Sequence, residues 1–264
     1  MKGRLALRSI VLLYLAALLL LPVGLIFYRT FENGLEPVWE ALTDGDTLHA
    51  LYLTVLIAVI AVPINAVFGI AAALVLVRQK FRGQGVINAL IDLPFAMSPV
   101  VIGLALLLLF GRQGWFGDYF MARDVQIIYA LPGMVFATIM VSLPFVVREV
   151  APVLREMGDE QEQAARTLGA SSWQTFRRIT LPGLKPGIAF GVVLATARAL
   201  GEFGAVSVVS GHLVGKTETL PLRVEERFQS FDMTGAYTAA VVLALLAVAT
   251  LVATRLVHRQ EVHR

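Results

Sequence analysis

Hydrophobic runs long enough to cross a bilayer dominate this chain of 264 residues. Each run has roughly 20 residues with few charges, which is what a membrane-spanning helix requires. Short polar segments separate the runs. The pattern predicts an all-α polytopic membrane protein with six transmembrane helices, at about 10–28, 50–77, 90–110, 127–147, 186–209 and 235–257.

The polar segments divide the expected fold into three parts. Residues 1–49 are predicted to form an N-terminal anchor helix followed by a polar outer loop, residues 50–257 the transmembrane domain, and residues 258–264 a short basic tail. The first run is too long for a secretion signal and lacks a small-x-small cleavage site, so we interpret it as an anchor.

Composition supports a membrane protein. The chain is 57% hydrophobic with a mean hydropathy of +0.74, and 16% of its residues are charged, against roughly 25% in soluble domains. The absence of cysteine excludes disulfides, thiolate metal sites and a cysteine nucleophile. The four histidines fall in expected loops or tails, so we predict no metal site and no catalytic residue.

The distribution of lysine and arginine predicts the orientation. The N-terminus, loop 78–92, segment 148–185 and the C-terminal tail hold 15 of these residues, whereas the other three loops hold six. Loops rich in lysine and arginine stay in the cytoplasm. Both termini and segment 148–185 are therefore predicted to be cytoplasmic.

Segment 148–185, which we call the island, has the pattern of two short helices. Two alanines favour a first helix that stops at Gly169. Ser171 and Gln174 have the spacing of a capping box, which begins a second helix that ends at Pro182. Such a pair could dock into a groove on a soluble partner or lie on the membrane surface, and the pattern alone leaves both open.

The spacing of alanines, glycine, isoleucine and Leu-Pro in the island resembles the cytoplasmic loop signature of permease subunits in binding-protein-dependent ABC importers. In that family the loop forms the coupling helix on the ATPase. The chain departs from the family pattern in having Gln163 directly before the alanines, where the family has Glu, and Glu162 lies one residue earlier. The resemblance assigns ATPase coupling to Glu162, Gln163, Ala164, Ala165, Gly169, Ile179, Leu181 and Pro182.

The fifth hydrophobic run contains a charged pair. Arg198 lies about 18 Å of helix rise after Pro186, near the middle of the bilayer, and Glu202 follows one turn later on the same face. A charge at that depth costs roughly 2.5–3.5 kcal/mol. The pair either lines a solute pathway, with Arg198 as the only intramembrane cation, or neutralises itself and pins neighbouring helices. The candidate pathway or gate residues are Arg198, Glu202, Gly201 and Gly204.

Glycines and an alanine share the face of this pair. Gly187, Gly191 and Ala195 fall within about 40° of the same line along the helix. Small residues on one face permit two helices to approach closely. We therefore expect this face to pack tightly against a neighbouring helix.

A second resemblance concerns the solute. Residues 197–205 are similar to a segment shared by permeases for sulfate and molybdate, and 206–212 with 219–225 are closer to the W-type subunit of sulfate–thiosulfate permeases. Residues 92–95 and 98–105 match the same family. The resemblance implies a MetI-like helical core, a bacterial inner-membrane location, a T-type permease partner, cytoplasmic ABC ATPase subunits and a periplasmic sulfate-binding protein.

Residues 211–217 resemble a phosphate-binding loop, but three residues separate the glycines where four are needed. We therefore expect no cofactor in this chain, with ATP bound by a partner subunit, and a transport subunit rather than an enzyme. A molybdate or tungstate permease and a self-sufficient secondary anion transporter remain the alternative functions. Membrane lipid is the expected surrounding, and no nucleic-acid partner is expected.

Overall fold

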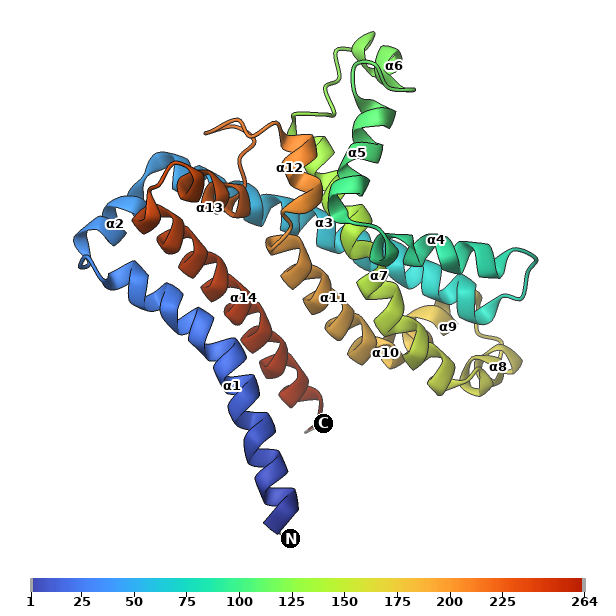
Figure 1. Ribbon diagram of the computed structural model, residues 1–264. Coiled ribbons are helices and arrows are strands. Elements are labelled where there is room, and N and C mark those ends of the chain that lie inside the picture. The colour runs from blue at the N-terminus through green and yellow to red at the C-terminus, as the bar shows by residue number, and fades with distance from the viewer. Residues whose placement is uncertain (1, 263–264) are drawn as a thin grey trace.

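The computed structural model describes residues 2–262, which form helices and no strand. Four long helices, α1 (Lys2–Phe31), α3 (Gly45–Arg78), α7 (Leu131–Met157) and α14 (Met233–Val262), each contain a stretch apolar and long enough to cross a membrane. Two bent helix pairs also qualify, which gives six candidate spans when each pair counts as one. The predicted all-α polytopic architecture is confirmed (Figure 1).

The centre of the bundle is formed by α3, α7 and α11 (Lys185–Leu200), which pack along one another. Asn65 on α3 donates from Nδ2 to Ser142 Oγ on α7 at 2.8 Å, and both side chains are buried. Nearby, a Cβ on Gly69 would lie 2.7 Å from the Cβ of Val146, so only glycine permits this approach. The polar bond and the tight contact fix the register of α3 against α7.

The small residues of α11 face α7, as the sequence predicts. A Cβ on Gly187 would lie 2.8 Å from the carbonyl oxygen of Glu149, and one on Gly191 would lie 3.0 Å from the Cα of Val146. Ala195 belongs to the same buried cluster. The contacts also show that α7 and α11 run antiparallel, because successive residues of α11 meet earlier residues of α7.

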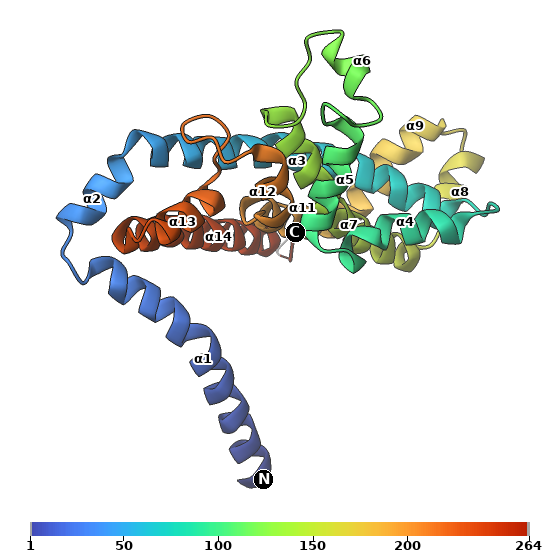
Figure 2. The same cartoon turned by 45° about the horizontal axis from the view of Figure 1, so that its top comes forward.

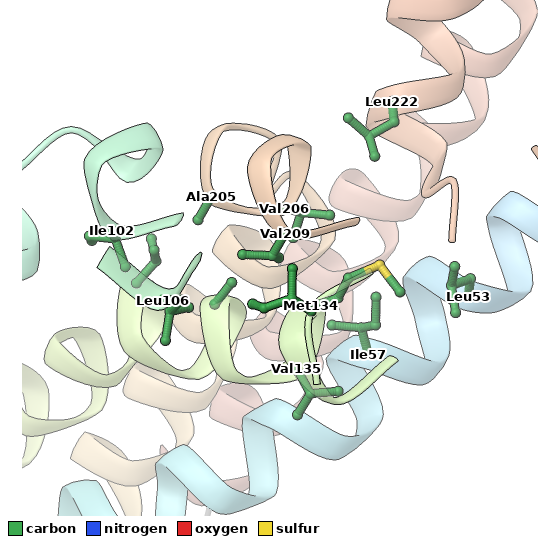
Figure 3. Close-up of a cluster of buried hydrophobic side chains, with 13 residues drawn as sticks. Leu53, Ile57, Ile102, Leu106, Met134, Val135, Ala205, Val206, Val209 and Leu222 are labelled. Carbon is green, nitrogen blue, oxygen red and sulfur yellow. The ribbon is translucent and has the colours of Figure 1, made fainter. Parts of the chain in front are cut away.

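A hydrophobic cluster closes the bundle end opposite the island (Figure 3). Met134 of α7 lies within it, beside Ile57 of α3. α5 (Pro99–Phe110) and α12 (Gly204–Ser210) supply Ile102 and Val206. We call this the loop end, because it carries α6 (Gly117–Met121) and α13 (Leu220–Gln229); the island end carries α8–α10.

Residues 29–49, predicted as a polar loop, are largely helical. α1 continues to Phe31, α2 (Glu36–Thr43) follows, and α3 already begins at Gly45. The side chain of Asp44 accepts a hydrogen bond from the Thr47 N–H at 3.3 Å, which caps α3. The N-terminal part of α1 diverges from the other helices (Figure 2), and the most apolar window of its candidate span has no buried residue, although Thr30 near its end is buried.

The predicted third span is not one helix. α4 (Gln84–Ala96) and α5 meet at an angle of 113°. Pro99 occupies the first turn of α5, where its missing N–H is harmless, and the residue before a proline avoids helical conformation. The break at Met97 and Ser98 therefore has a local cause.

The predicted start of the island is also wrong. α7 runs on to Met157, so residues 148–157 are helical and not part of a loop. Charged residues end the hydrophobic run after Val147, but Val150 and Leu154 keep one face of the helix buried. The remaining island consists of α8 (Glu160–Thr167), α9 (Ser172–Thr175), the π-helical turn η1 (Phe176–Thr180) and α10 (Leu181–Gly183).

Two further predictions need adjustment. The fifth span breaks after Leu200, and α12 begins at Gly204, whereas one helix was expected as far as Val209. The predicted tail, 258–264, continues α14 as far as Val262, and residues 263–264 lie outside the described residues.

Candidate functional site

Glu162 is the buried centre of the island. It lies on α8 and accepts two hydrogen bonds from Arg78, from Nε to Oε2 and from Nη2 to Oε1, each at 3.2 Å. The hydroxyl of Thr180 donates to Oε1 at 2.9 Å. Glu162 therefore joins α8 to η1 and to the C-terminal end of α3.

Arg78 extends this junction to α7. Its Nη1 donates to the Leu154 carbonyl at 3.1 Å and its Nη2 to the Gly158 carbonyl at 2.6 Å. These carbonyls lie at the C-terminal end of α7, where a positive charge is favoured. One arginine thus connects the ends of α3 and α7 to the island.

The first half of the signature lies at the surface. Gln163, at the family's Glu position, is exposed and donates to Asp159 Oδ2 at 2.8 Å. Ala164 is exposed and Ala165 half-buried. Gly169 has a φ of +86° and no atom within 4 Å of an added Cβ. Its backbone conformation, and not lack of space, makes glycine the favoured residue there.

The second half of the signature is partly buried. Ser171 and Gln174 form the predicted capping box, with both hydrogen bonds present. Ile179 and Leu181 are half-buried, and Pro182 is exposed near the end of α10. This helical segment then turns by 67° into α11. The island is therefore continuous with a helix of the bundle centre.

Large apolar side chains project from the island. Leu168 is 88% exposed and Trp173 is 66% exposed. The Trp173 ring stacks on Phe176, with ring centroids 5.6 Å apart. Adjacent exposed apolar groups of this size mark a surface that another protein or a membrane covers.

The charged pair of the fifth span forms as predicted. Arg198 Nη2 lies 2.6 Å from Glu202 Oε2, and Glu202 is buried. Its other oxygen, Oε1, accepts from the Ala205 N–H at 2.8 Å and so caps α12. The Arg198 side chain is 27% exposed and has no other ion-pair or hydrogen-bond partner among residues 2–262. Its remaining N–H groups are free for another ligand.

The break between α4 and α5 in the third span contacts the break between α11 and α12 in the fifth span. A Cβ on Gly204 would lie 3.0 Å from the Cβ of Pro99, and one on Gly103 would lie 2.8 Å from the Cβ of Val208. The break between α11 and α12 thus packs against the break between α4 and α5. Gly201 is exposed, and a Cβ added there would lie 3.6 Å from the Ala197 carbonyl oxygen. The structure brings Gly201 and Gly204 together with the Arg198–Glu202 pair.

Sequence reasoning missed a second charged pair. Arg148 on α7 donates from Nε to Asp92 Oδ1 on α4 at 2.7 Å, and from Nη2 to Asn88 Oδ1 at 3.3 Å. Both elements belong to candidate spans. Arg198 is therefore not the only arginine within the bounds of the candidate spans. An isolated aspartate within a hydrophobic run is the signal that could have revealed the pair.

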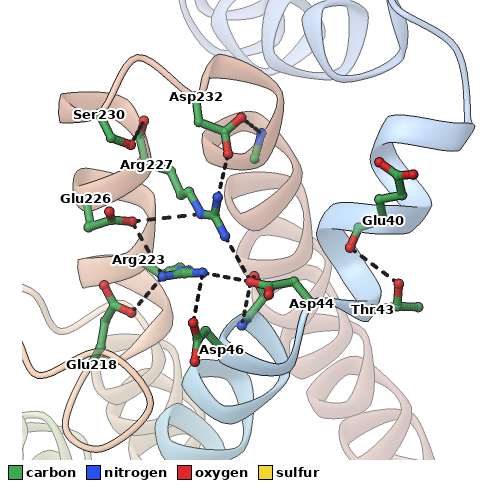
Figure 4. A network of polar contacts seen from close by, with 12 residues as sticks. Glu40, Thr43, Asp44, Asp46, Glu218, Arg223, Glu226, Arg227, Ser230 and Asp232 are labelled. Atoms are coloured by element: carbon green, nitrogen blue, oxygen red, sulfur yellow. Dashed lines mark hydrogen bonds and ion pairs between the residues drawn. The ribbon is translucent and has the colours of Figure 1, made fainter.

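The ionic cluster at the loop end was also missed (Figure 4). Arg223 of α13 is buried and donates to Glu218 Oε2 at 3.2 Å and to Asp44 Oδ2 at 2.7 Å. Asp44 Oδ2 also accepts from Arg227 at 2.9 Å, and Arg227 donates to Asp232 at 2.8 Å. The cluster joins α13 to the first turns of α3 and α14.

Burial and neighbouring charges shift the pKa values of two carboxyl groups in this cluster. Burial raises the pKa of Glu218. Partial burial alone would raise the pKa of Asp44, but hydrogen bonds from Arg223 and Thr47 lower it below its ordinary value.

The described part of the chain holds no group of three or more His, Cys, Asp or Glu side chains that could bind a metal ion.

These features define a class of protein: a helical membrane protein whose bundle carries the island, with its exposed apolar side chains, at one end and an ion pair within its candidate spans. Residues 65–261 match the family model described as binding-protein-dependent transport system inner membrane component. The chain belongs to this family.

Two curated relatives are similar over most of their length. The sulfate transport system permease protein CysW of Synechocystis is 51% identical, covering 99% of this chain and 95% of the relative. The sulfate transport system permease protein CysT of Escherichia coli is 40% identical, covering 88% of this chain and 84% of the relative.

Solved structures support the fold. A chain of the bacterial alginate ABC transporter, in complex with an alginate pentasaccharide-bound periplasmic protein, matches with a TM-score of 0.78 at 15% identity, covering 98% of this chain and 95% of that one. A chain of the inward-facing MetNI methionine ABC transporter matches with a TM-score of 0.61 at 17% identity, covering 85% and 98%. The expected MetI-like helical core is confirmed.

Proposed function

We propose that this chain is a permease subunit of an ATP-driven importer for sulfate. The single observation that carries the proposal is the 51% identity to a sulfate permease over nearly the whole of both chains. The geometry agrees with it. A partly exposed arginine within the spans offers unused N–H groups to an anion, and guanidinium groups bind tetrahedral oxyanions well.

The proposed orientation places both termini and the island in the cytoplasm. It rests on the excess of lysine and arginine in these segments. The arrangement supports it, because the N-terminal part of α1, the C-terminal part of α14 and helices α8 and α10 lie in the lower half of Figure 1, whereas α2, α6 and α13 lie in the upper half.

The island is the proposed docking site for a cytoplasmic ATPase subunit. Leu168 and Trp173 supply the apolar contact, and Gln163, Ala164 and Gly169 are exposed on the same segment. Glu162, Ile179, Leu181 and Pro182 then serve a different purpose from surface contact. Glu162 holds the island to Arg78 through an ion pair, and the other three residues belong to the helical segment that continues into α11.

Three partner subunits complete the proposed importer. A periplasmic sulfate-binding protein delivers the anion to the loop end, and a T-type permease forms the other half of the translocation path. ATP is bound and hydrolysed by the ATPase, so this chain needs no cofactor of its own. The similarity to both CysW and CysT fits a pair of related permeases.

The solute is tested by transport. The complex is reconstituted in liposomes containing ATP, with the binding protein outside, and uptake of labelled sulfate is measured. We expect ATP-dependent uptake that excess thiosulfate suppresses more strongly than molybdate. Uptake of molybdate in preference to sulfate would assign a molybdate permease, and uptake without ATP would assign a secondary transporter.

A further inference from the structure

The pair formed by Arg148 and Asp92 lies in an unusual place for two charges. Arg148 is about 13 Å of helix rise from the island end of α7, within a candidate span. Its side chain is 36% exposed and that of Asp92 is 37% exposed, although they are ion-paired. Charges in a spanning segment face other protein or a water-filled cavity, and do not face lipid.

The pair also leaves donors unused. Arg148 uses Nε and Nη2 for Asp92 and Asn88, and Nη1 has no hydrogen-bond partner in the described part of the chain. The supporting helix α4 buries none of its residues. A planar guanidinium with a free edge, held on one side by a carboxylate and an amide, is oriented to bind an anion on the other side.

The second arginine lies along the same bundle at a different depth. Gly187 of α11 lies against Val150 of α7, within one turn of Arg148. About 16 Å of helix rise separates Gly187 from Arg198. The two arginines are therefore about 13 Å apart along the bundle axis, with Arg148 nearer the island end. α5 continues α4 beyond its break and reaches Gly204, beside the Arg198–Glu202 pair.

We propose that Arg148 is a second contact for the transported oxyanion, nearer the island end than Arg198, with Asp92 and Asn88 as its positioning residues. This inference rests on the proposed anion import. An anion moving from Arg198 towards the island end passes the depth of Arg148. In both places a carboxylate partly offsets the positive charge, which keeps the anion from binding too tightly to leave.

Because the chain has no cysteine, thiol labelling tests the proposal directly. Arg148→Cys is made in the assembled complex, with Arg155→Cys, on the exposed face nearer the end of α7, as control. Labelling by methanethiosulfonates reports whether position 148 meets water, and this readout does not depend on transport. Labelling of the unsubstituted complex gives the background from the partner subunits.

We expect Arg148→Cys to react with both the aminoethyl and the sulfonatoethyl reagent. We also expect its sulfate uptake to fall at least tenfold, and only the aminoethyl reagent, which restores a cation, to recover a substantial part of it. Uptake by Arg155→Cys should stay near the unsubstituted value. If Arg148→Cys does not assemble, Arg148→Cys combined with Asp92→Asn removes the uncompensated carboxylate and is tested in the same way.

No reaction at position 148 would overturn the proposal and indicate a dry contact with the second permease. Equal recovery with both reagents, or undiminished uptake, would also overturn it. Failure of the sulfate assignment is distinguishable, because the unsubstituted complex would then take up no sulfate while position 148 still reacted with the reagents.

Discussion

Arg78 and Glu162 form a bidentate ion pair between the end of a transmembrane helix and the buried face of the island. The pair places the island's only buried carboxylate among the described residues opposite an arginine that also holds the end of α7. One guanidinium therefore joins the island to the C-terminal ends of both α3 and α7.

Glu162→Ala should loosen the island. Loss of the carboxylate leaves Arg78 with two carbonyl partners and Thr180 without its acceptor, and breaking a buried pair costs about 3–5 kcal/mol at most. The partial exposure of Arg78 places the expected cost at the lower end of that range. Thermal unfolding of the purified subunit complex, and the amount of ATPase retained on it, measure the effect.

Gln163→Ala is the matched control for this substitution. Gln163 lies next to Glu162, but its side chain is exposed and donates to Asp159 at the surface. Its removal should therefore leave the free energy of unfolding within about 0.5 kcal/mol of that of the unsubstituted protein. Equal effects of the two substitutions would show that the buried pair contributes nothing specific.

Single and double substitutions test whether Arg198 and Glu202 stabilise the protein as a pair. Arg198→Ala leaves a buried, unpaired carboxylate, which is strongly destabilising. Glu202→Gln keeps an acceptor for the Ala205 N–H. Arg198→Ala should therefore assemble less well than Arg198→Ala combined with Glu202→Gln, as measured by complex yield.

Sulfate uptake by the same variants decides the role of the pair. If Arg198 contacts the anion, the double variant assembles, keeps basal ATPase activity and transports no sulfate. If the charges only neutralise each other, the double variant recovers transport. Full assembly and full uptake in all variants would contradict both roles.

Among the residues of the ionic cluster, substitution of Arg223 should lower the stability of the protein most. Arg223→Met leaves Glu218 and Asp44 without their shared donor, and should lower stability by about 3 kcal/mol or more. Arg227→Met, at a more exposed position, should cost less. Thermal unfolding of both variants checks the order, and Glu218→Gln should partly rescue Arg223→Met but not Arg227→Met.

Reporter fusions test the orientation. Fusions at Gly158 and after the C-terminus should report the cytoplasm, and fusions at Gly34 and Lys216 should report the periplasm. Gly34 is suitable because a Cβ added there would meet no atom within 4 Å, whereas insertion at Asp44 would disrupt the ionic cluster. A cytoplasmic signal from Lys216 would contradict the six-span topology.

Local patterns predicted the island's helices well. The capping box at Ser171 and the stop at Gly169 depend on residues within one helical turn, so sequence spacing suffices to find them. The same holds for the glycine face of α11, because the helical period of 3.6 residues is enough to place Gly187 and Gly191 on one face. The pair Arg198–Glu202 was found for this reason too.

Features that depend on distant residues were not predictable in the same way. Arg223 and Asp44 are 179 positions apart, and only folding brings them together. The break before α12 has no proline within ten residues of it, and Glu202 stabilises the break by accepting a hydrogen bond from the first turn of α12. Arg148 was assigned to a loop because charge ended the run, although burial of Val150 and Leu154 continues α7.

The coupling role of the island is tested most directly by the ATP hydrolysed for each sulfate transported, measured on reconstituted complexes. Gly169→Asp adds a charge at a position whose φ of +86° disfavours side chains, and Gly169→Asn, which tolerates that conformation better, is its neutral control. We expect Gly169→Asp to lose the ATPase or to raise the ratio severalfold, and Gly169→Asn to stay closer to the unsubstituted complex. A Gly169→Asp complex that assembles normally, with an unchanged ratio and rate, would show that the island is an ordinary surface segment.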